Sequence, residues 1–360
     1  MFADNHRISR IQMERQYLLA YLGPLVLWIG PGLQGRNGFL SILAGTLIFC
    51  IWIFFLLRQV HIFRYPEKYW GKVMSRVIAL FYGSYLILTG GWLAANIGNI
   101  LQEYMIQGMP HWLAAGLFVL AALGSSGGLQ ERARFAQTAW PVVGGILALL
   151  LLLAAFQGQG GQGQQTQALL QIQETPVWNS DSAEEILKGI VWLLISLLGT
   201  VLIPFLEVDY NGGGEHTGVL VKMIGKAALW LCAVSVLLQA VFGTRGAETL
   251  EYPVLNLMAG VRIPGGFVRR IDMIFLTVVL FALLFSTGSI FFYSKYIFGR
   301  VGIRVGRIPA AVICFLLGTI DFGGWSLVEE YPKVICYIYL PLFLIMTICN
   351  VMLRRKKFGK

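Results

Sequence analysis

Apolar stretches long enough to cross a membrane recur along this chain and limit what it can fold into. A transmembrane helix needs about 20 apolar residues, and the chain holds about ten stretches of roughly that length. They cover residues 16–32, 38–57, 77–101, 111–126, 136–156, 186–206, 217–243, 271–298, 308–321 and 334–353. Charged residues make up only 13% of the sequence, whereas soluble domains contain about 25%. The pattern predicts an all-α integral membrane protein of about ten transmembrane helices.

The distribution of lysine and arginine predicts which loops face the cytoplasm. With the N-terminus inside, about three quarters of the 28 basic residues fall on that side, as the positive-inside rule requires. Both termini are therefore expected in the cytoplasm, and the net charge of +10 needs no nucleic acid to explain it. We expect residues 1–360 to form a single polytopic membrane domain, with a short cytoplasmic N-terminus at 1–15, a flexible Gln/Gly-rich outer loop at 157–185 and a basic cytoplasmic C-terminus at 354–360.

No motif in the sequence predicts a catalytic centre, a metal site or a cofactor site. The five cysteines form no CxxC pair, which a zinc site would usually show. The glycine-rich run Gly124–Gly128 lacks the lysine of a phosphate-binding loop. We see no central Asp or Glu with a partner in the apolar stretches, and proton-driven pumps usually need one. We therefore expect a protein that is not an enzyme and that binds no cofactor, metal or nucleic acid.

Glycine and proline interrupt two apolar stretches at matching positions of a chain divided into five helices and five. The first stretch contains Leu22-Gly23-Pro24 and Gly30-Pro31-Gly32, and the sixth contains Ser196–Thr200 and Pro204. A break frees backbone N–H and C=O groups, which hydrocarbon cannot satisfy. Transporters built from inverted repeats place such breaks at their ligand sites. We expect a 5+5 inverted-repeat fold with discontinuous first and sixth helices, although an ordinary kink would explain either interruption alone.

A cavity between the two interrupted helices is the candidate ligand-binding site. Polar and aromatic residues of the third and eighth stretches are expected to form its other walls. Two of these predictions have an alternative in which the residue has a purely structural role. Asn96 could bridge helices instead, and the hydroxyls around Ser286 could bond back to the preceding helical turn. The predicted ligand-binding residues are Gly23, Pro24, Leu25, Trp92, Asn96, Ser196, Gly199, Thr200, Ser286 and Thr287.

Several short motifs, taken in their order and spacing, resemble those of a known family. They are Gln12 ahead of Leu22-Gly23, Arg64-Tyr65-Pro66, Leu198-Gly199, Glu251–Leu255 and Val268–Asp272. The chain resembles the spore germination permeases of the GerAB type, the B subunits of nutrient germinant receptors, within the amino acid–polyamine–organocation transporter superfamily. The resemblance extends over nearly the whole chain. The chain departs from the family pattern at Leu25, at Ala95-Asn96 and at Val201, where the family often has a Gly-x-Gly-like run, an Arg/Glu pair and a glutamate, respectively.

The resemblance implies a protein of the inner spore membrane, or of the cell membrane, of an endospore-forming bacterium. It would recognise a small nutrient, an amino acid, and would work with the A and C subunits of a germinant receptor. Two alternatives stay open. The chain could be an amino-acid transporter of the same fold, or a scaffold subunit that binds no ligand itself.

Overall fold

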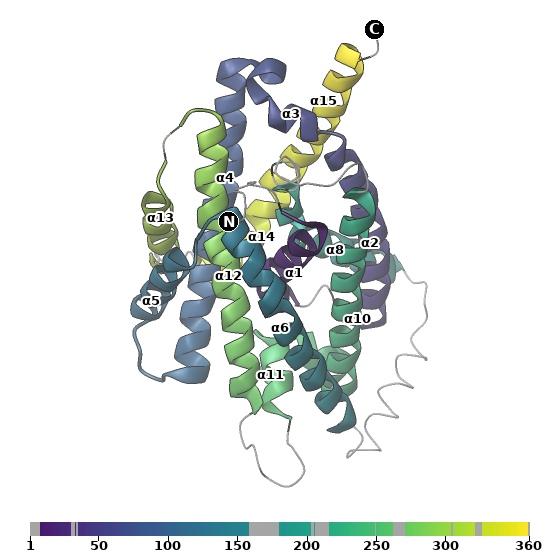
Figure 1. The fold of residues 1–360 in the computed structure, drawn as a ribbon. Coiled ribbons are helices and arrows are strands. Elements are labelled where there is room, and N and C mark those ends of the chain that lie inside the picture. The colour runs from purple at the N-terminus through teal and green to yellow at the C-terminus, as the bar shows by residue number, and fades with distance from the viewer. Residues whose placement is uncertain are drawn as a thin grey trace.

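The computed structural model describes residues 8–29, 33, 35–157, 180–202, 205, 216–248, 250–261, 271–303, 305–320 and 326–358, and almost all of them are helical (Figure 1). The helices are α1 (Arg10–Trp28), α2 (Gly35–Leu57), α3 (Val60–Arg64), α4 (Pro66–Ile100), α5 (His111–Gly124), α6 (Leu129–Gln157), α8 (Ser180–Ser196), α10 (His216–Glu248), α11 (Pro253–Ala259), α12 (Ile271–Arg300), α13 (Arg307–Thr319), α14 (Leu327–Val334) and α15 (Leu340–Phe358). One π-helical turn, Leu101–Met105, extends α4, and another, Ile335–Tyr339, joins α14 to α15.

The length and composition of the helices identify the chain as an integral membrane protein. Six described segments are long and apolar enough to cross a membrane: Asn37–Leu57, Pro66–Met105, Leu129–Ala155, Leu220–Phe242, Ile271–Arg300 and Leu327–Leu353. Helices α5 and α13 are apolar but shorter. Every predicted apolar stretch coincides with a helix, which confirms the all-α membrane architecture. The number of spans and the 5+5 arrangement stay predictions.

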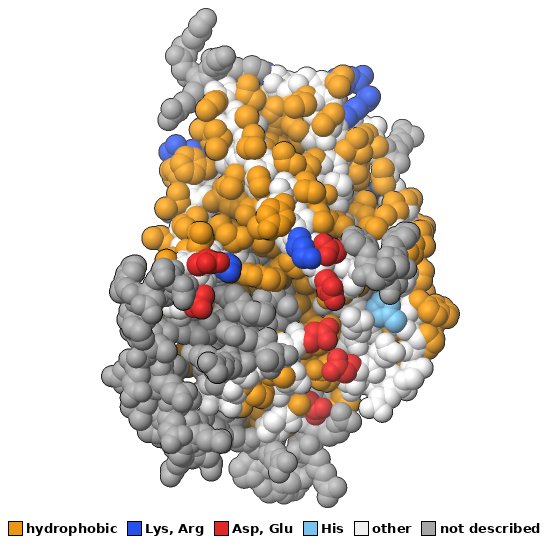
Figure 2. All heavy atoms as spheres, turned by 180° about the vertical axis from the view of Figure 1, so that it is seen from behind, with side chains coloured by type: hydrophobic (Ala, Val, Ile, Leu, Met, Phe, Trp, Pro, Cys, Tyr) orange, Lys and Arg blue, Asp and Glu red, His pale blue; other side chains and the backbone are white. Residues whose placement is uncertain are grey.

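Large hydrophobic side chains cover much of the outer surface of the bundle. Leu47 of α2, Leu120 of α5 and Leu229 of α10 are 66%, 66% and 72% exposed. Figure 2 shows hydrophobic side chains spread over the upper part of one face of the molecule. A water-soluble protein rarely exposes an apolar surface of this extent, whereas lipid tails provide the environment that these side chains require.

Helix α1 lies at the centre of the bundle, where it packs on α12, α6 and α10 (Figure 1). A glycine permits its close approach to α12, because a Cβ at Gly23 would lie 2.7 Å from the backbone nitrogen of Leu283. Helices α4 and α13 meet in the same way, since a Cβ at Gly318 would lie 2.8 Å from the carbonyl oxygen of Gly91. Small residues at such crossings are common in membranes, where van der Waals packing holds helices together.

The two predicted helix breaks have different outcomes. Helix α1 continues through Pro24 to Trp28, so the break predicted at Gly23-Pro24 is wrong. The second interruption of this stretch, Gly30–Gly32, lies outside the described residues. By contrast, α8 ends at Ser196, and a 3-10 turn follows at Leu198–Leu202, so the break predicted at Ser196–Thr200 is confirmed. Pro204 also lies outside the described part of the chain.

Pro24 changes the hydrogen bonding of α1 without ending the helix. Proline has no N–H, so the helical bond that residue 24 would donate to the carbonyl of Ala20 cannot form. The proline ring is tolerated because neighbouring helices hold the segment in place. Pro24 therefore removes one backbone hydrogen bond from α1 but does not unwind the helix.

A buried network of polar side chains connects α15 to α2, to α4 and to Gln59, which lies between α2 and α3. The indole N–H of Trp70 donates to Asn350 Oδ1 at 2.9 Å, and Asn350 Nδ2 donates to Gln59 Oε1 at 3.0 Å. Gln59 Nε2 donates in turn to the carbonyl of Thr347, and Trp52 Nε1 donates to the Thr347 hydroxyl, both at 3.2 Å. Each side chain in the network thus depends on the others for its partners.

The substitution Asn350→Ala is expected to lower the stability of the folded chain by about 1–3 kcal/mol, because it leaves the buried amide of Gln59 and the indole of Trp70 without their partner. The measurement is the thermal unfolding midpoint of the detergent-solubilised protein. Cys349→Ala is the matched control, since Cys349 is exposed on the adjacent position of α15. Equal midpoints for the two variants would contradict a stabilising role for the network.

Candidate functional site

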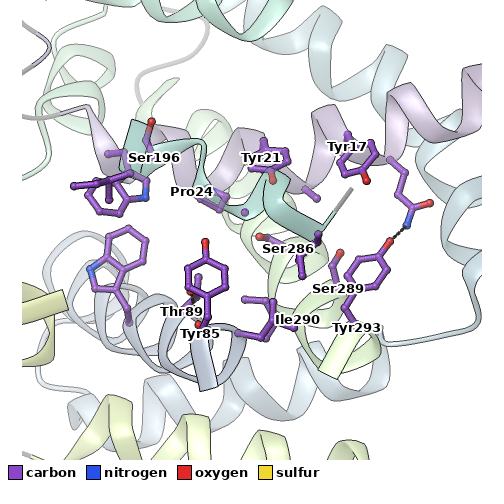
Figure 3. A pocket seen from close by; sticks show the side chains of 18 of the residues that line it. Tyr17, Tyr21, Pro24, Tyr85, Thr89, Ser196, Ser286, Ser289, Ile290 and Tyr293 are labelled. Carbon is purple, nitrogen blue, oxygen red and sulfur yellow. Dashed lines mark hydrogen bonds between the residues drawn. The ribbon is translucent and has the colours of Figure 1, made fainter. Parts of the chain in front are cut away.

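A cavity lies between α1, α4, α8 and α12, with one wall completed by Tyr331 of α14 (Figure 3). Its volume is about 90 Å³. Its described lining residues are Ile8, Met13, Gln16, Tyr17, Ala20, Tyr21, Pro24, Trp28, Tyr85, Leu86, Thr89, Trp92, Ile195, Ser196, Gly199, Leu202, Ser286, Ser289, Ile290, Tyr293 and Tyr331. None of these side chains is an Asp, Glu, Lys, Arg or His. The cavity wall therefore consists of aromatic rings, aliphatic groups, hydroxyls and one amide.

Four aromatic residues from four helices, Trp28, Trp92, Trp192 and Tyr331, pack together beside the cavity; we name them the aromatic cluster. The ring centroids of Trp92 and Tyr331 are 4.8 Å apart and the rings are stacked. Trp28 lies 5.0 Å from Trp92 and 5.3 Å from Trp192 by the same measure. Such contacts add about 0.5–1.5 kcal/mol per pair beyond the burial of their area. The cluster thus joins α1, α4, α8 and α14 at the cavity.

Hydroxyl groups along the wall are anchored to the backbone or to one another. Thr89 Oγ1 donates to the carbonyl of Tyr85 and also lies 2.8 Å from the hydroxyl of Tyr331. Ser196 Oγ donates to the carbonyl of Leu193 at 2.8 Å, where α8 ends. Figure 3 shows Ser196 at one end of the group of labelled side chains, and Tyr17 and Tyr293 at the other end. These bonds fix the hydroxyl oxygens in position and leave their lone pairs available to the cavity.

Gln16 of α1 is the amide in the wall. Its Nε2 donates to the hydroxyl of Tyr293 of α12 at 2.8 Å. Its Oε1 is buried and has no hydrogen-bond partner among the described residues. A buried acceptor without a partner is costly, which makes this oxygen a suitable contact for a hydrogen-bond donor inside the cavity.

A buried arginine lies behind the wall. Arg132 of α6 is 2% exposed, and its Nη2 donates to the hydroxyl of Ser289 and to the carbonyl of Phe285, the latter at 2.7 Å. Its Nη1 donates to the carbonyl of Ser125 at 2.9 Å, and its guanidinium carbon lies 4.3 Å from the centroid of the Phe285 ring. Sequence reasoning assigned Arg132 to a cytoplasmic loop, because the predicted stretch began at residue 136.

Half of the ten predicted ligand-binding residues line the cavity: Pro24, Trp92, Ser196, Gly199 and Ser286. The other half are packed elsewhere: Gly23, Leu25, Asn96, Thr200 and Thr287. Gly23 faces the backbone of α12, and Leu25 is buried in the core. The hydroxyl of Thr287 bonds back to the carbonyl of Leu283, as in the structural alternative for this segment, and the hydroxyl of Thr200 bonds to the carbonyl of Leu197.

Asn96 connects α4 to Tyr252, the residue directly before α11, rather than lining the cavity, which is close to the structural alternative that the sequence left open. Its Nδ2 donates to the carbonyl of Trp92 at 2.8 Å, and its Oδ1 accepts a bond of 3.5 Å from the hydroxyl of Tyr252. Burial and the nearby carboxylate of Glu251 raise the pKa of Tyr252 well above its usual value. The phenol therefore stays protonated and can act as the donor of this bond.

Sequence reasoning missed the five tyrosines of the wall, Tyr17, Tyr21, Tyr85, Tyr293 and Tyr331, as well as Gln16. A signal was present, because tyrosines in membrane proteins concentrate at the interface with water, whereas Tyr21 and Tyr85 lie well inside apolar stretches. Tyr17 and Tyr21 are also four residues apart, which places them on one face of α1.

Comparison with known proteins places the chain in a family. The profile of a family described as "Spore germination protein" matches residues 32–304, about three quarters of the chain. The matched region includes every helix from α2 to α12. Three of the four helices around the cavity, α4, α8 and α12, are therefore matched, whereas α1 precedes the match. No curated protein matches the chain. The resemblance drawn from the sequence motifs is confirmed, and the chain belongs to the spore germination protein family.

Proposed function

We propose that this protein is the membrane subunit of a germinant receptor, which recognises a small nutrient, an amino acid, in the cavity between α1 and α8. The observation that carries the proposal is a cavity beside a helix break, with hydroxyl and aromatic walls and no charged side chain among the residues described in its lining. Small-molecule sites are mostly apolar and contain a few polar groups. The lining of this cavity has that composition.

The backbone around the cavity supports a ligand that carries an amino group. The last carbonyls of a helix have no helical partner, and the end of α8 at Ser196 borders the cavity. The carbonyl of Ala20 lacks the bond that Pro24 cannot donate, and Ala20 also lines the cavity. Carbonyl oxygens and the negative end of a helix dipole favour a cation. Aromatic rings such as Trp28 and Tyr85 favour it as well.

In this proposal, ligand binding shifts a conformational equilibrium that partner subunits detect. A ligand can cause such a shift only if it prefers one of the two states. The 3-10 turn after α8 and the aromatic cluster together link four helices to the occupant of the cavity. We further propose that the helices form a 5+5 inverted repeat and that both termini are cytoplasmic. The partners would be the A and C receptor subunits in the inner spore membrane.

The test is the thermal unfolding midpoint of the full chain in detergent, measured against each standard amino acid. At least one amino acid is expected to raise the midpoint in a saturable way, because a ligand that binds only the folded state stabilises it by about 2.7 kcal/mol at 100 times its Kd. Flux of that amino acid into proteoliposomes containing this chain alone would favour the transporter alternative. If no amino acid binds, the receptor proposal fails and the scaffold alternative gains support.

A further inference from the structure

Two arginines lie behind the wall that α12 contributes to the cavity. Arg132 places a guanidinium behind Ser289, with only neutral oxygens and the ring of Phe285 around it. Arg307, at the start of α13, lies on the same side, with its Nη1 3.4 Å from Ser126 Oγ. The ion pairs Glu14–Lys226, Glu184–Lys188 and Glu330–Lys333 do not include Arg132. The groups that contact its guanidinium, two carbonyls, one hydroxyl and one aromatic ring, carry no negative charge.

Ser289 lies between Arg132 and the cavity, because it bonds to the guanidinium and also belongs to the cavity lining. Its oxygen accepts a hydrogen bond from Arg132 Nη2, and its hydroxyl donates to the carbonyl of Phe285 at 2.8 Å. A hydroxyl can rotate to another acceptor, and one that accepts a bond from a cation becomes a better donor. The Phe285 carbonyl would keep its bond to Arg132. Ser289 can therefore turn its hydroxyl toward an anionic group in the cavity without leaving Phe285 unsatisfied.

The opposite wall, on α1, offers acceptors. Gln16 Oε1 has no partner among the described residues, and the carbonyl of Ala20 lacks the bond that Pro24 cannot donate. Both residues line the cavity and are one helical turn apart. Because α1 stays helical through Pro24, it presents no freed N–H groups at the predicted break. An acidic group therefore finds no freed backbone N–H on this part of α1, whereas α12 offers the hydroxyls of Ser286 and Ser289.

We propose that the ligand is a zwitterion whose carboxylate lies against Ser286 and Ser289 of α12, in the field of Arg132, while its ammonium group lies against Gln16 and Ala20 of α1. This inference rests on the proposed function and adds which wall binds which end of the ligand. Figure 3 shows Ser286 and Ser289 on the side of the cavity opposite Tyr21 of α1. A fixed charge acts strongly across such a site, because the surroundings have a low dielectric constant. Arg132 is a positioning residue, since it acts through Ser289.

The experiment compares each neutral standard amino acid with its carboxamide, which keeps the ammonium group and the side chain but has no carboxylate. Affinities come from the concentration that gives half of the maximal thermal stabilisation of the full chain. The carboxamide of the best-binding amino acid is expected to bind at least about 10-fold more weakly, the effect of losing one hydrogen bond to a charged group. The ratio of the affinity for the amino acid to the affinity for its carboxamide is expected to fall toward one in the variants Ser289→Ala and Arg132→Gln. The variant Arg132→Lys, which keeps the positive charge, should retain most of this ratio.

The ratio separates recognition of the carboxylate from a structural role, because a merely distorted cavity would weaken the acid and the amide alike. An amide that binds as well as its parent acid would overturn the inference while leaving the proposed function intact. The same holds if the ratio is unchanged in Ser289→Ala. If neither amino acids nor amides bind, the proposed function and this inference fail together. The comparison in the unaltered chain decides the question even if a variant does not fold.

Discussion

Replacing Gly199 with leucine is expected to abolish ligand binding and the nutrient-triggered germination of spores that depend on this chain. A Cβ at Gly199 would already lie 2.8 Å from the hydroxyl of Tyr21, and the remaining atoms of leucine would extend into the cavity that Gly199 lines. The affinity for the best-binding amino acid should fall by about 100-fold or more, which corresponds to about 2.7 kcal/mol.

The matched control is Gly145→Leu, at an exposed position of α6 where an added Cβ meets no atom within 4 Å. Both variants add the same apolar side chain to a membrane protein, but only one adds it to the cavity. Protein level in the membrane is measured for both. A Gly199→Leu variant that reaches the normal level and still binds amino acid with unchanged affinity would exclude this cavity as the ligand site.

The substitution Gly23→Val is expected to reduce the stability of the folded chain by about 3 kcal/mol, at the upper end of the usual range for overpacked cores. The added Cβ would lie 2.7 Å from the backbone nitrogen of Leu283 and 3.0 Å from the carbonyl carbon of Ala282. Backbone atoms cannot rotate away, so α1 would have to move off α12 and widen the cavity.

The thermal unfolding midpoint of the purified chain measures this effect. Gly225→Val is the control, because Gly225 is exposed on α10 and has no atom within 4 Å of the position of its added Cβ. The control also accounts for the change in helix propensity from glycine to valine. Equal midpoints for the two variants would mean that α1 and α12 can separate at little cost.

The helices could be predicted from the sequence because their signal is length and composition. Each apolar stretch became a helix, and the glycine at Leu198–Thr200 marked a true break. The break at Pro24 was wrong because a proline removes one hydrogen bond, and whether the helix then ends depends on the neighbouring helices. Helices α6 and α12 both pack on α1. Such support comes from residues far away in the sequence.

The walls of the cavity could be predicted only in part. Helices that are apolar all around give no indication of which side faces inward, so Thr287 and Ser286 looked equivalent although only Ser286 lines the cavity. Arg132 was placed in a loop because charges usually end an apolar stretch. In the structure it is buried, since the carbonyls of Ser125 and Phe285 and the ring of Phe285 surround its guanidinium. Only the folded bundle brings these groups together.

The partners of Arg132 have a consequence for the order in which the chain is assembled during synthesis. Its guanidinium bonds to Phe285 and Ser289, which lie more than 150 positions later in the chain. An arginine within an isolated membrane helix costs about 2.5–3.5 kcal/mol at the bilayer centre. Until the ribosome has delivered α12, α6 lacks these acceptors. The bonds of Arg132 to Phe285 and Ser289 can therefore form only after α12 has been synthesised, whereas its bond to the carbonyl of Ser125 involves an earlier part of the chain.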